Sequence, residues 1–133
     1  MKKYILVIDD SPTICTIIEH SLCQAGYGVI SFHDGEQAIA WQGACREAPP
    51  DLVLLDLCLP ARDGFAVLRD LRALPNCRQT PIGIISRRDG LLDKLKAKLL
   101  GATLFLPKPF TLEELVETVH AYLGSATPAE ALR

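Results

Sequence analysis

The sequence predicts an α/β fold in which a doubly wound, five-stranded parallel sheet carries five helices on its two faces. Along the 133 residues, five short runs rich in β-branched and apolar residues alternate with five longer segments of helical period. Polar residues that can carry chemistry follow several of these runs, always at the same end. Such alternation favours parallel strands joined by right-handed crossovers.

The five predicted strands are short and apolar. They are Tyr4–Ile8, Gly28–Phe32, Leu52–Asp56, Ile82–Ser86 and Thr103–Pro107. The third lies within the stretch PDLVLLDLCLP and is apolar at consecutive positions, as in a strand buried on both faces. A lone ionised carboxylate there would cost several kcal/mol or would protonate, so Asp56 requires a partner or a function.

The first two helical segments have recognisable starts. The first begins at Ser11, an N-cap followed by Pro12, and it ends at Gly26. Its apolar residues are Ile14, Ile17, Ile18 and Leu22. The second opens at Asp34-Gly35. It is centred on Ala38, Ile39 and Trp41.

The third and fourth segments have amphipathic spacing. The third opens at Asp63-Gly64 and ends before Pro75. Its apolar face consists of Phe65, Leu68 and Leu71. The fourth starts near Leu91. Its predicted core residues are Leu92, Leu95 and Leu99, with Lys94, Lys96 and Lys98 on the remaining surface.

The fifth segment begins with a T-x-x-E capping box, Thr111 to Glu114. Leu115, Val119 and Leu123 follow at core spacing. Residues 124–133 have no periodic support, so we expect one domain over residues 1–123 and a C-terminal tail over 124–133.

Composition limits the partners and the location. A formal net charge of −2 gives no electrostatic case for nucleic acid. No run is long and apolar enough to span a bilayer, and the N-terminus lacks a signal-peptide core, so we expect a cytoplasmic protein without a membrane partner. The odd, scattered cysteines are interpreted as reduced small hydrophobic residues. They are Cys15, Cys23, Cys45, Cys58 and Cys77.

Four chain segments aim reactive groups at the carboxyl edge of the predicted sheet. Asp9 and Asp10 follow the first strand, Asp56 ends the third, Ser86 ends the fourth and Lys108 follows the fifth. Two carboxylates about 4 Å apart repel by roughly 4 kcal/mol at an effective dielectric near 20, so this group requires cations. The lysine supplies one charge, and Mg²⁺ suits hard carboxylate ligands. A carboxylate in such a site can attack phosphorus and form an aspartyl phosphate.

Each residue alone has a plainer interpretation. Asp9 and Asp10 fit a charged N-terminal cap, Ser86 a turn, and Lys108 a solvated loop. Their joint placement, together with the buried position of Asp56, favours a single site.

These motifs resemble the CheY-like receiver domain of two-component response regulators, of the stand-alone type. The resemblance rests on DD after the first strand, D-x-x-x-P-x-x-D-G from Asp56 to Gly64, a hydroxyl residue ending the fourth strand, and KPF from Lys108 to Phe110. It covers about residues 2–123. It implies the flavodoxin-like strand order 2-1-3-4-5 and phosphorelay signal transduction, without a metabolic enzyme activity.

The resemblance also implies a phosphoacceptor and a metal site. Asp56 would take a phosphoryl group from a histidine kinase or a phosphotransfer protein. Asp10 and Asp56 would bind Mg²⁺ directly, with the backbone carbonyl of Cys58 as a third ligand and Asp9 acting through water.

A switch is implied as well. Ser86 and Lys108 would contact phosphoryl oxygens, and the peptide bond before Pro109 would be cis. Phe105 matches the aromatic switch position, although it also fits a core residue. The output would be a population shift of the face formed by helix four, strand five and helix five, which binds a protein partner.

Three arginines depart from the commonest family pattern. Arg62 follows Asp56, and Arg87 and Arg88 follow Ser86. We expect them around the mouth of the site, where they would alter the lifetime of the phosphoryl group, most simply by lengthening it. The segment from Ser86 to Phe110 is similar to receivers of chemotaxis-like systems of twitching motility.

Other functions stay open at this point. A phosphorylation-independent docking module fits the same fold, and Arg62 and Arg87 leave room for it. A haloacid-dehalogenase-type phosphatase would need D-x-D after its first strand, and this chain lacks that motif. A flavin carrier is disfavoured by the acidic loop DDSPT, where a flavin phosphate needs backbone donors.

Overall fold

The computed structural model describes residues 3–44, 49–59 and 62–124, which form a parallel five-stranded sheet in the order β2-β1-β3-β4-β5. The strands are β1 (Tyr4–Ile8), β2 (Gly28–Phe32), β3 (Leu52–Leu55), β4 (Ile82–Ser86) and β5 (Leu104–Pro107). The predicted fold class and strand order are therefore confirmed. Two boundaries differ by one residue, because Asp56 lies just after β3 and Thr103 just before β5.

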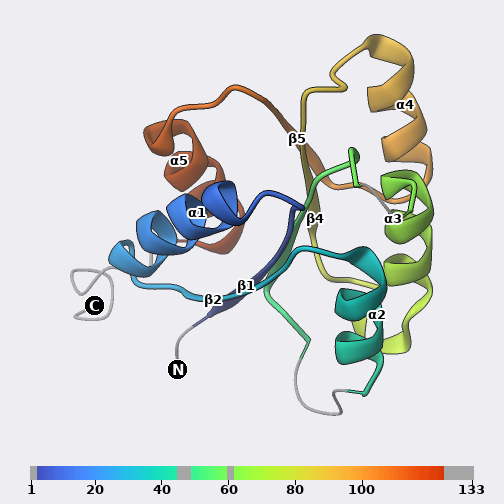
Figure 1. The fold of residues 1–133 in the computed structure, drawn as a ribbon, viewed down its shortest axis with the longest axis horizontal. Coiled ribbons are helices and arrows are strands. Elements are labelled where there is room, and N and C mark those ends of the chain that lie inside the picture. The colour runs from blue at the N-terminus through green and yellow to red at the C-terminus, as the bar shows by residue number, and fades with distance from the viewer. Residues whose placement is uncertain (1–2, 45–48, 60–61, 125–133) are drawn as a thin grey trace.

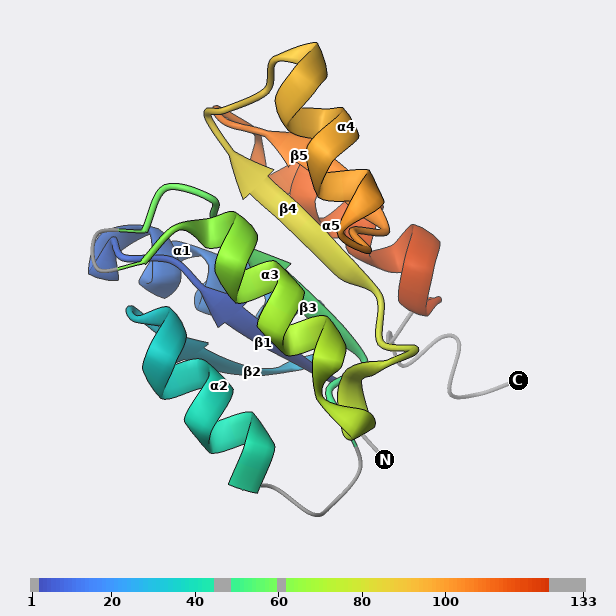
Figure 2. The same ribbon diagram turned by 90° about the vertical axis from the view of Figure 1, so that its right-hand side faces the viewer.

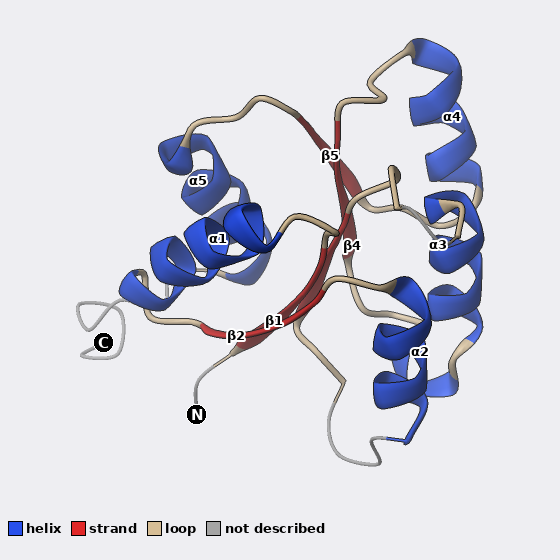
Figure 3. Ribbon diagram, in the orientation of Figure 1, coloured by secondary structure: helices blue, strands red, loops and turns tan. Residues whose placement is uncertain are grey.

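Helices cover both faces of the sheet. They are α1 (Pro12–Gln24), α2 (Gly35–Ala44), α3 (Gly64–Ala73), α4 (Leu91–Leu99) and α5 (Leu112–Leu123), with a short 3-10 helix, η1 (Pro75–Cys77). Helices α1 and α5 lie on one face, and α2, α3 and α4 lie on the other (Figures 1 and 3). In the part of the chain that the structure describes, no helix has the length and apolar character needed to cross a membrane.

The predicted helix starts are confirmed by their hydrogen bonds. The Ser11 side chain accepts from the backbone N–H of Ile14, and the Asp63 side chain accepts from the N–H of Phe65. At the start of α5, Thr111 and Glu114 form the complete capping box. These local bonds fix where α1, α3 and α5 leave the edge of the sheet that holds the site.

The core has two layers separated by the sheet, and β1 contributes to both. Ile5 and Val7 pack with the residues of α1 and α5, whereas Leu6 and Ile8 pack with those of α2 and α3. All four side chains are fully buried. Figure 2 looks onto the face that α2, α3 and α4 cover. Strand β1 is therefore held from both sides, which fixes the position of the residues that follow it.

The predicted core face of α4 is wrong. Leu92, Leu95 and Leu99 are 79%, 51% and 79% exposed, and the buried residue of the helix is Ala97. At 100° per residue, Ala97 lies on the side of the helix opposite these leucines. The small side chain faces the sheet, and the leucines face outward.

Two further details concern helix α1 and the cysteines. Ile17 of α1 is 42% exposed, and the buried residues of that helix are Cys15, Ile18 and Leu22. The four described cysteines are free thiols, as predicted, with Cys15 and Cys77 buried and Cys23 and Cys58 exposed. Cys45 and residues 125–133 of the predicted tail lie outside the described residues.

Candidate functional site

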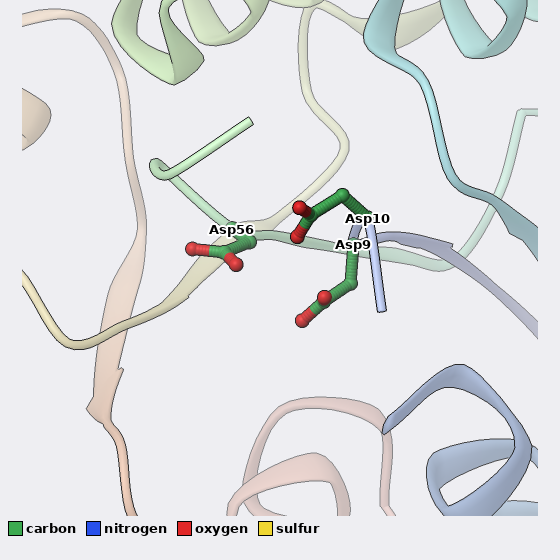
Figure 4. Close-up of side chains that lie close together, drawn as sticks. All are labelled: Asp9, Asp10 and Asp56. Atoms are coloured by element: carbon green, nitrogen blue, oxygen red, sulfur yellow. The ribbon is translucent and has the colours of Figure 1, made fainter. Parts of the chain in front are cut away.

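Three carboxyl groups meet at the carboxyl edge of the two central strands. Asp9 and Asp10 follow β1, and Asp56 follows β3. Carboxylate oxygens of all three lie within 4.8 Å of one another. Figure 4 shows the groups gathered around one space. The predicted acidic cluster is thus present, built by two neighbouring parallel strands that end together.

Backbone N–H groups hold the two buried aspartates. Asp9 is fully buried, and its Oδ1 accepts from the N–H of Ser11 at 2.9 Å. Asp56 is 4% exposed, and its Oδ1 accepts from the N–H of Cys58 at 2.9 Å. The role of the Cys58 N–H was not predicted, although an aspartate that accepts from the N–H two residues later is a common turn motif.

Lys108 bridges the two buried carboxylates. It follows β5, and its Nζ lies 2.6 Å from Asp9 Oδ2 and 3.1 Å from Asp56 Oδ2. Burial alone would lower the pKa of Lys108, but hydrogen bonds and charge from both aspartates outweigh it and raise the pKa above the ordinary 10.5. The ammonium group therefore stays charged at neutral pH.

Asp56 is electrostatically unfavourable in its ionised form. Burial raises the pKa of its carboxyl above the ordinary value of 3.8, and the negative charge of Asp9 adds to this effect. The Cys58 N–H and Lys108 act in the opposite direction without cancelling it. A further cation near Asp56 would relieve this cost.

The donor set fits a divalent cation. Three ionised carboxylates and one ammonium leave a formal charge of −2 at the site. Asp10 is exposed, and within the described ranges its carboxylate accepts no hydrogen bond. Hard oxygen ligands, one of them open to solvent, match the preference of Mg²⁺ for a few carboxylates plus water or phosphate.

The other predicted residues surround this cluster. Ser86 is fully buried at the end of β4, and its Oγ accepts from the N–H of Arg88 at 3.0 Å and lies 3.8 Å from Cys58 Sγ. The peptide bond between Lys108 and Pro109 is cis. Phe105 of β5 is half-buried and contacts the core on the α3 and α4 side.

Two of the three arginines are engaged elsewhere. Arg62 forms ion pairs with Glu36 of α2 and Asp70 of α3. Arg88 pairs with Asp93 at 2.9 Å and lies over the Phe65 ring, with 5.0 Å between its Cζ and the ring centroid. The guanidinium groups of Arg62 and Arg88 are therefore held by carboxylates of the neighbouring helices α2, α3 and α4. Arg87 is exposed and, together with Lys108, lines a cavity beside the site.

An apolar cavity adjoins Lys108 on the α1 side. It has a volume of about 270 Å³. Its lining consists of Ile14, Ile17, Ile18, Arg87, Lys108, Pro109, Phe110 and Leu112. The apolar spacing of α1 in the sequence did not indicate this cavity.

Comparisons with known proteins agree with this geometry. Residues 5–120 match the family model described as the response regulator receiver domain. The chain is 34% identical over 128 residues to Protein PilG of Pseudomonas aeruginosa, covering 96% of this chain and 93% of that protein.

The solved structures that are similar to this chain include the following two. One is the chemotaxis protein CheY4 of Vibrio cholerae, with a TM-score of 0.85, 31% identity, and coverage of 92% of this chain and all of that one (100%). The other is the receiver domain of the sensor histidine kinase PA1611 of Pseudomonas aeruginosa, with a TM-score of 0.81, 32% identity, and coverage of 94% and 100%. That structure has a magnesium ion coordinated in the active-site cleft.

Proposed function

The chain belongs to the response regulator receiver domain family, and we propose that Asp56 accepts a phosphoryl group from a histidine kinase or a phosphotransfer protein. The observation that carries this proposal is the meeting of Asp9, Asp10, Asp56 and Lys108 at one edge of the sheet. The match to the receiver-domain model gives no support to the two alternatives, a D-x-D phosphatase and a flavin carrier.

The proposed reaction is a displacement at phosphorus. A carboxylate oxygen of Asp56 forms the new O–P bond while the P–N bond to the donor histidine breaks, and the electron pair returns to the imidazole. Asp10, Asp56 and the carbonyl of Cys58, with Asp9 acting through water, would hold Mg²⁺, which neutralises charge on the phosphoryl oxygens when bound. The Cys58 N–H keeps the Asp56 carboxylate oriented for attack.

Lys108 and Ser86 would respond to the new phosphoryl group. In the structure Lys108 pairs with Asp56 itself, and once that carboxylate is phosphorylated to an acyl phosphate the ammonium can pair with a phosphoryl oxygen. The Ser86 Oγ accepts from the Arg88 N–H, and its hydroxyl would donate to a phosphoryl oxygen. Movement of this hydroxyl frees space that Phe105 occupies in the switched state, which shifts the face of α4, β5 and α5 toward a partner.

The apolar cavity beside Lys108 gives a place for the donor. Its position next to both Lys108 and Arg87 puts an apolar contact surface at the entrance to the acceptor, and the two cations attract a phosphorylated partner. The activity is regulatory: self-phosphorylation and self-dephosphorylation, with the output delivered by protein binding.

The test is the intact mass of the protein after incubation with Mg²⁺ and acetyl phosphate. We expect a gain of one phosphoryl group in the wild type and none in Asp56→Asn or in a metal-free sample. A histidine kinase or phosphotransfer donor is tried in parallel, because small donors react slowly with some acceptors. A folded, Mg²⁺-binding chain that gains no phosphoryl group from either donor would support the phosphorylation-independent docking module instead.

A further inference from the structure

Helix α4 is attached to the domain largely through positively charged side chains. Ala97 is the buried residue of this helix, so apolar packing contributes little to its attachment. The Lys96 Nζ lies 4.4 Å from the centroid of the Phe65 ring of α3. The Lys94 Nζ lies 5.5 Å from the centroid of the Phe105 ring of β5. Because exposed cation–π contacts are weak, a further contact at the start of the helix can decide its position.

Arg88 makes such a contact, and it connects three elements at once. Its backbone N–H donates to Ser86 Oγ at the end of β4 at 3.0 Å. Its guanidinium donates to Asp93 Oδ1 in the first turn of α4 at 2.9 Å. The same guanidinium lies over the ring of Phe65, a 3% exposed residue in the first turn of α3, with 5.0 Å between Cζ and the ring centroid. In Figure 2, β4 lies between α3 and α4, the two helices that this side chain reaches.

The hydrogen bond to Ser86 links this contact to the acceptor site. In the proposed function the buried Ser86 hydroxyl donates to a phosphoryl oxygen on Asp56. A displacement of the hydroxyl toward Asp56 either draws the Arg88 N–H with it or breaks the bond between them. The connection to α4 is short and turns tightly, because the Asp89 N–H donates to the Arg87 carbonyl at 3.0 Å. A shift of the Arg88 backbone therefore cannot leave both contacts of its guanidinium in place.

We propose that Arg88 is a positioning residue that holds α4 in place in the unphosphorylated protein and releases it when Ser86 turns to the phosphoryl group. The release separates the guanidinium from Asp93 and from the Phe65 ring. This inference rests on the proposed function and deepens it. It adds a route from the acceptor to α4 that passes through the backbone between β4 and α4 and does not require Phe105.

A purely structural role of Arg88 differs from this coupling in one measurable respect. If the guanidinium only stabilised α4, its removal and the removal of the Ser86 hydroxyl would act independently, and their effects would add. If the bond to Ser86 instead sets the backbone from which the guanidinium reaches Asp93 and Phe65, loss of the hydroxyl also disengages the guanidinium. The second change then has little left to remove.

The experiment uses the full chain and follows amide hydrogen exchange of α4 by mass spectrometry. The variants are Arg88→Met, Ser86→Ala, the double variant, and Arg88→Lys, which keeps a cation. Arg69→Met is the matched control, because Arg69 of α3 also pairs with an aspartate, Asp70 at 3.5 Å, on the surface. Beryllofluoride, an unreactive mimic of the phosphoryl group, is titrated with Mg²⁺ into the wild type, Arg88→Met and the control by calorimetry.

We expect Arg88→Met and Ser86→Ala each to speed exchange in α4 by about three- to tenfold, the range that one ion pair and one cation–π contact support. The double variant should exchange no faster than the faster single variant. Arg88→Lys should recover most of the protection, and Arg69→Met should match the wild type. Beryllofluoride should speed α4 exchange in the wild type. Because coupling is reciprocal, Arg88→Met should bind beryllofluoride about three- to tenfold more tightly than the wild type does.

Three results would overturn the inference. They are unchanged α4 exchange in Arg88→Met, additive effects of the two single changes in the double variant, and equal beryllofluoride affinity of Arg88→Met and the wild type. The acceptor role is tested separately by mass. A wild type that binds no beryllofluoride and gains no phosphoryl group contradicts the proposed function, whereas the exchange rates of the single and double variants still decide whether Ser86 and Arg88 together hold α4.

Discussion

Replacing Asp56 by Asn should stabilise the metal-free protein while it abolishes phosphoryl acceptance. Asp56 is 4% exposed, and its carboxylate shares a 4.8 Å cluster with those of Asp9 and Asp10. An amide of the same shape removes the buried charge and keeps an oxygen that accepts from the Cys58 N–H. Lys108 retains its shorter bond to Asp9, so it is not left unpaired.

The expected magnitude follows from the distances. At an effective dielectric near 20, each carboxylate neighbour within 4.8 Å repels Asp56 by at least about 3.5 kcal/mol, and Lys108 at 3.1 Å attracts it by about 5 kcal/mol. The repulsions exceed the attraction by roughly 1.5 kcal/mol, and desolvation acts in the same direction. For a domain of this size, such a gain corresponds to a rise in Tm of about 5 °C.

The sign of the pH dependence is determined by the raised pKa of Asp56. The folded state binds this proton more tightly than the unfolded state does, so ionisation costs stability once the pH rises above the ordinary value of 3.8. The stability gap between Asp56→Asn and the wild type should be absent below that pH. It should open as the pH rises through the folded-state pKa and stay constant above it.

The stability difference between Asp56→Asn and the wild type is measured by thermal unfolding, with EDTA and with Mg²⁺. The two pH values are pH 7 and the lowest pH that preserves the fold. Saturating Mg²⁺ should stabilise the wild type and shrink or reverse the difference, because the variant has lost a carboxylate ligand. Asp51→Asn is the control: Asp51 Oδ2 accepts from the Tyr4 N–H at 2.8 Å near the start of β1, and an amide can keep that bond. A lower Tm for Asp56→Asn than for the wild type in EDTA would refute this reasoning.

Three further predictions concern positively charged side chains near the ends of the strands. Lys108→Met should lower the free energy of unfolding in urea at pH 7 by about 3–5 kcal/mol, because two buried carboxylates lose their partner. Added Mg²⁺ should restore part of this free energy, and an unchanged unfolding midpoint would contradict the pairing. Arg72→Met should lower the free energy of unfolding by about 2–4 kcal/mol, since its guanidinium donates to four backbone carbonyls around η1 and after α4 at 2.6 to 3.0 Å. A loss below about 1 kcal/mol in the same assay would be too small for that role. Arg87→Ala should shorten the half-life of the aspartyl phosphate, measured by loss of the phosphorylated mass over time. Equal decay rates in both proteins would show that Arg87 does not affect the lifetime of the phosphoryl group.

The elements of the fold were predictable because their signals are local. Ser11, Asp63 and Thr111 each form the capping bond that their position in the sequence indicates. The near-continuous apolar runs of β1 and β3 correspond to strands buried on both faces. The acidic cluster followed from the same logic, because parallel strands end at one edge and bring the residues after them together.

Contacts that depend on side-chain reach were not predictable. Lys108 was expected near the aspartates, but a strand order cannot say that one ammonium would bridge Asp9 and Asp56. Arg62 was expected at the mouth of the site, and a long flexible side chain instead reaches Glu36 and Asp70 on neighbouring helices. Sequence position gives the origin of such a side chain, and competing charges within several ångströms decide its direction.

The error at α4 has a different origin and a functional consequence. Periodicity shows that leucines share a side of a helix, but it does not say whether that side faces the sheet or the solvent. In α4 the sheet-facing position belongs to Ala97, so the helix contributes little apolar area to the core and leaves its leucines exposed. A helix held by so few buried side chains costs little free energy to displace from the sheet, and the proposed phosphorylation of Asp56 would require only a small energy to shift it.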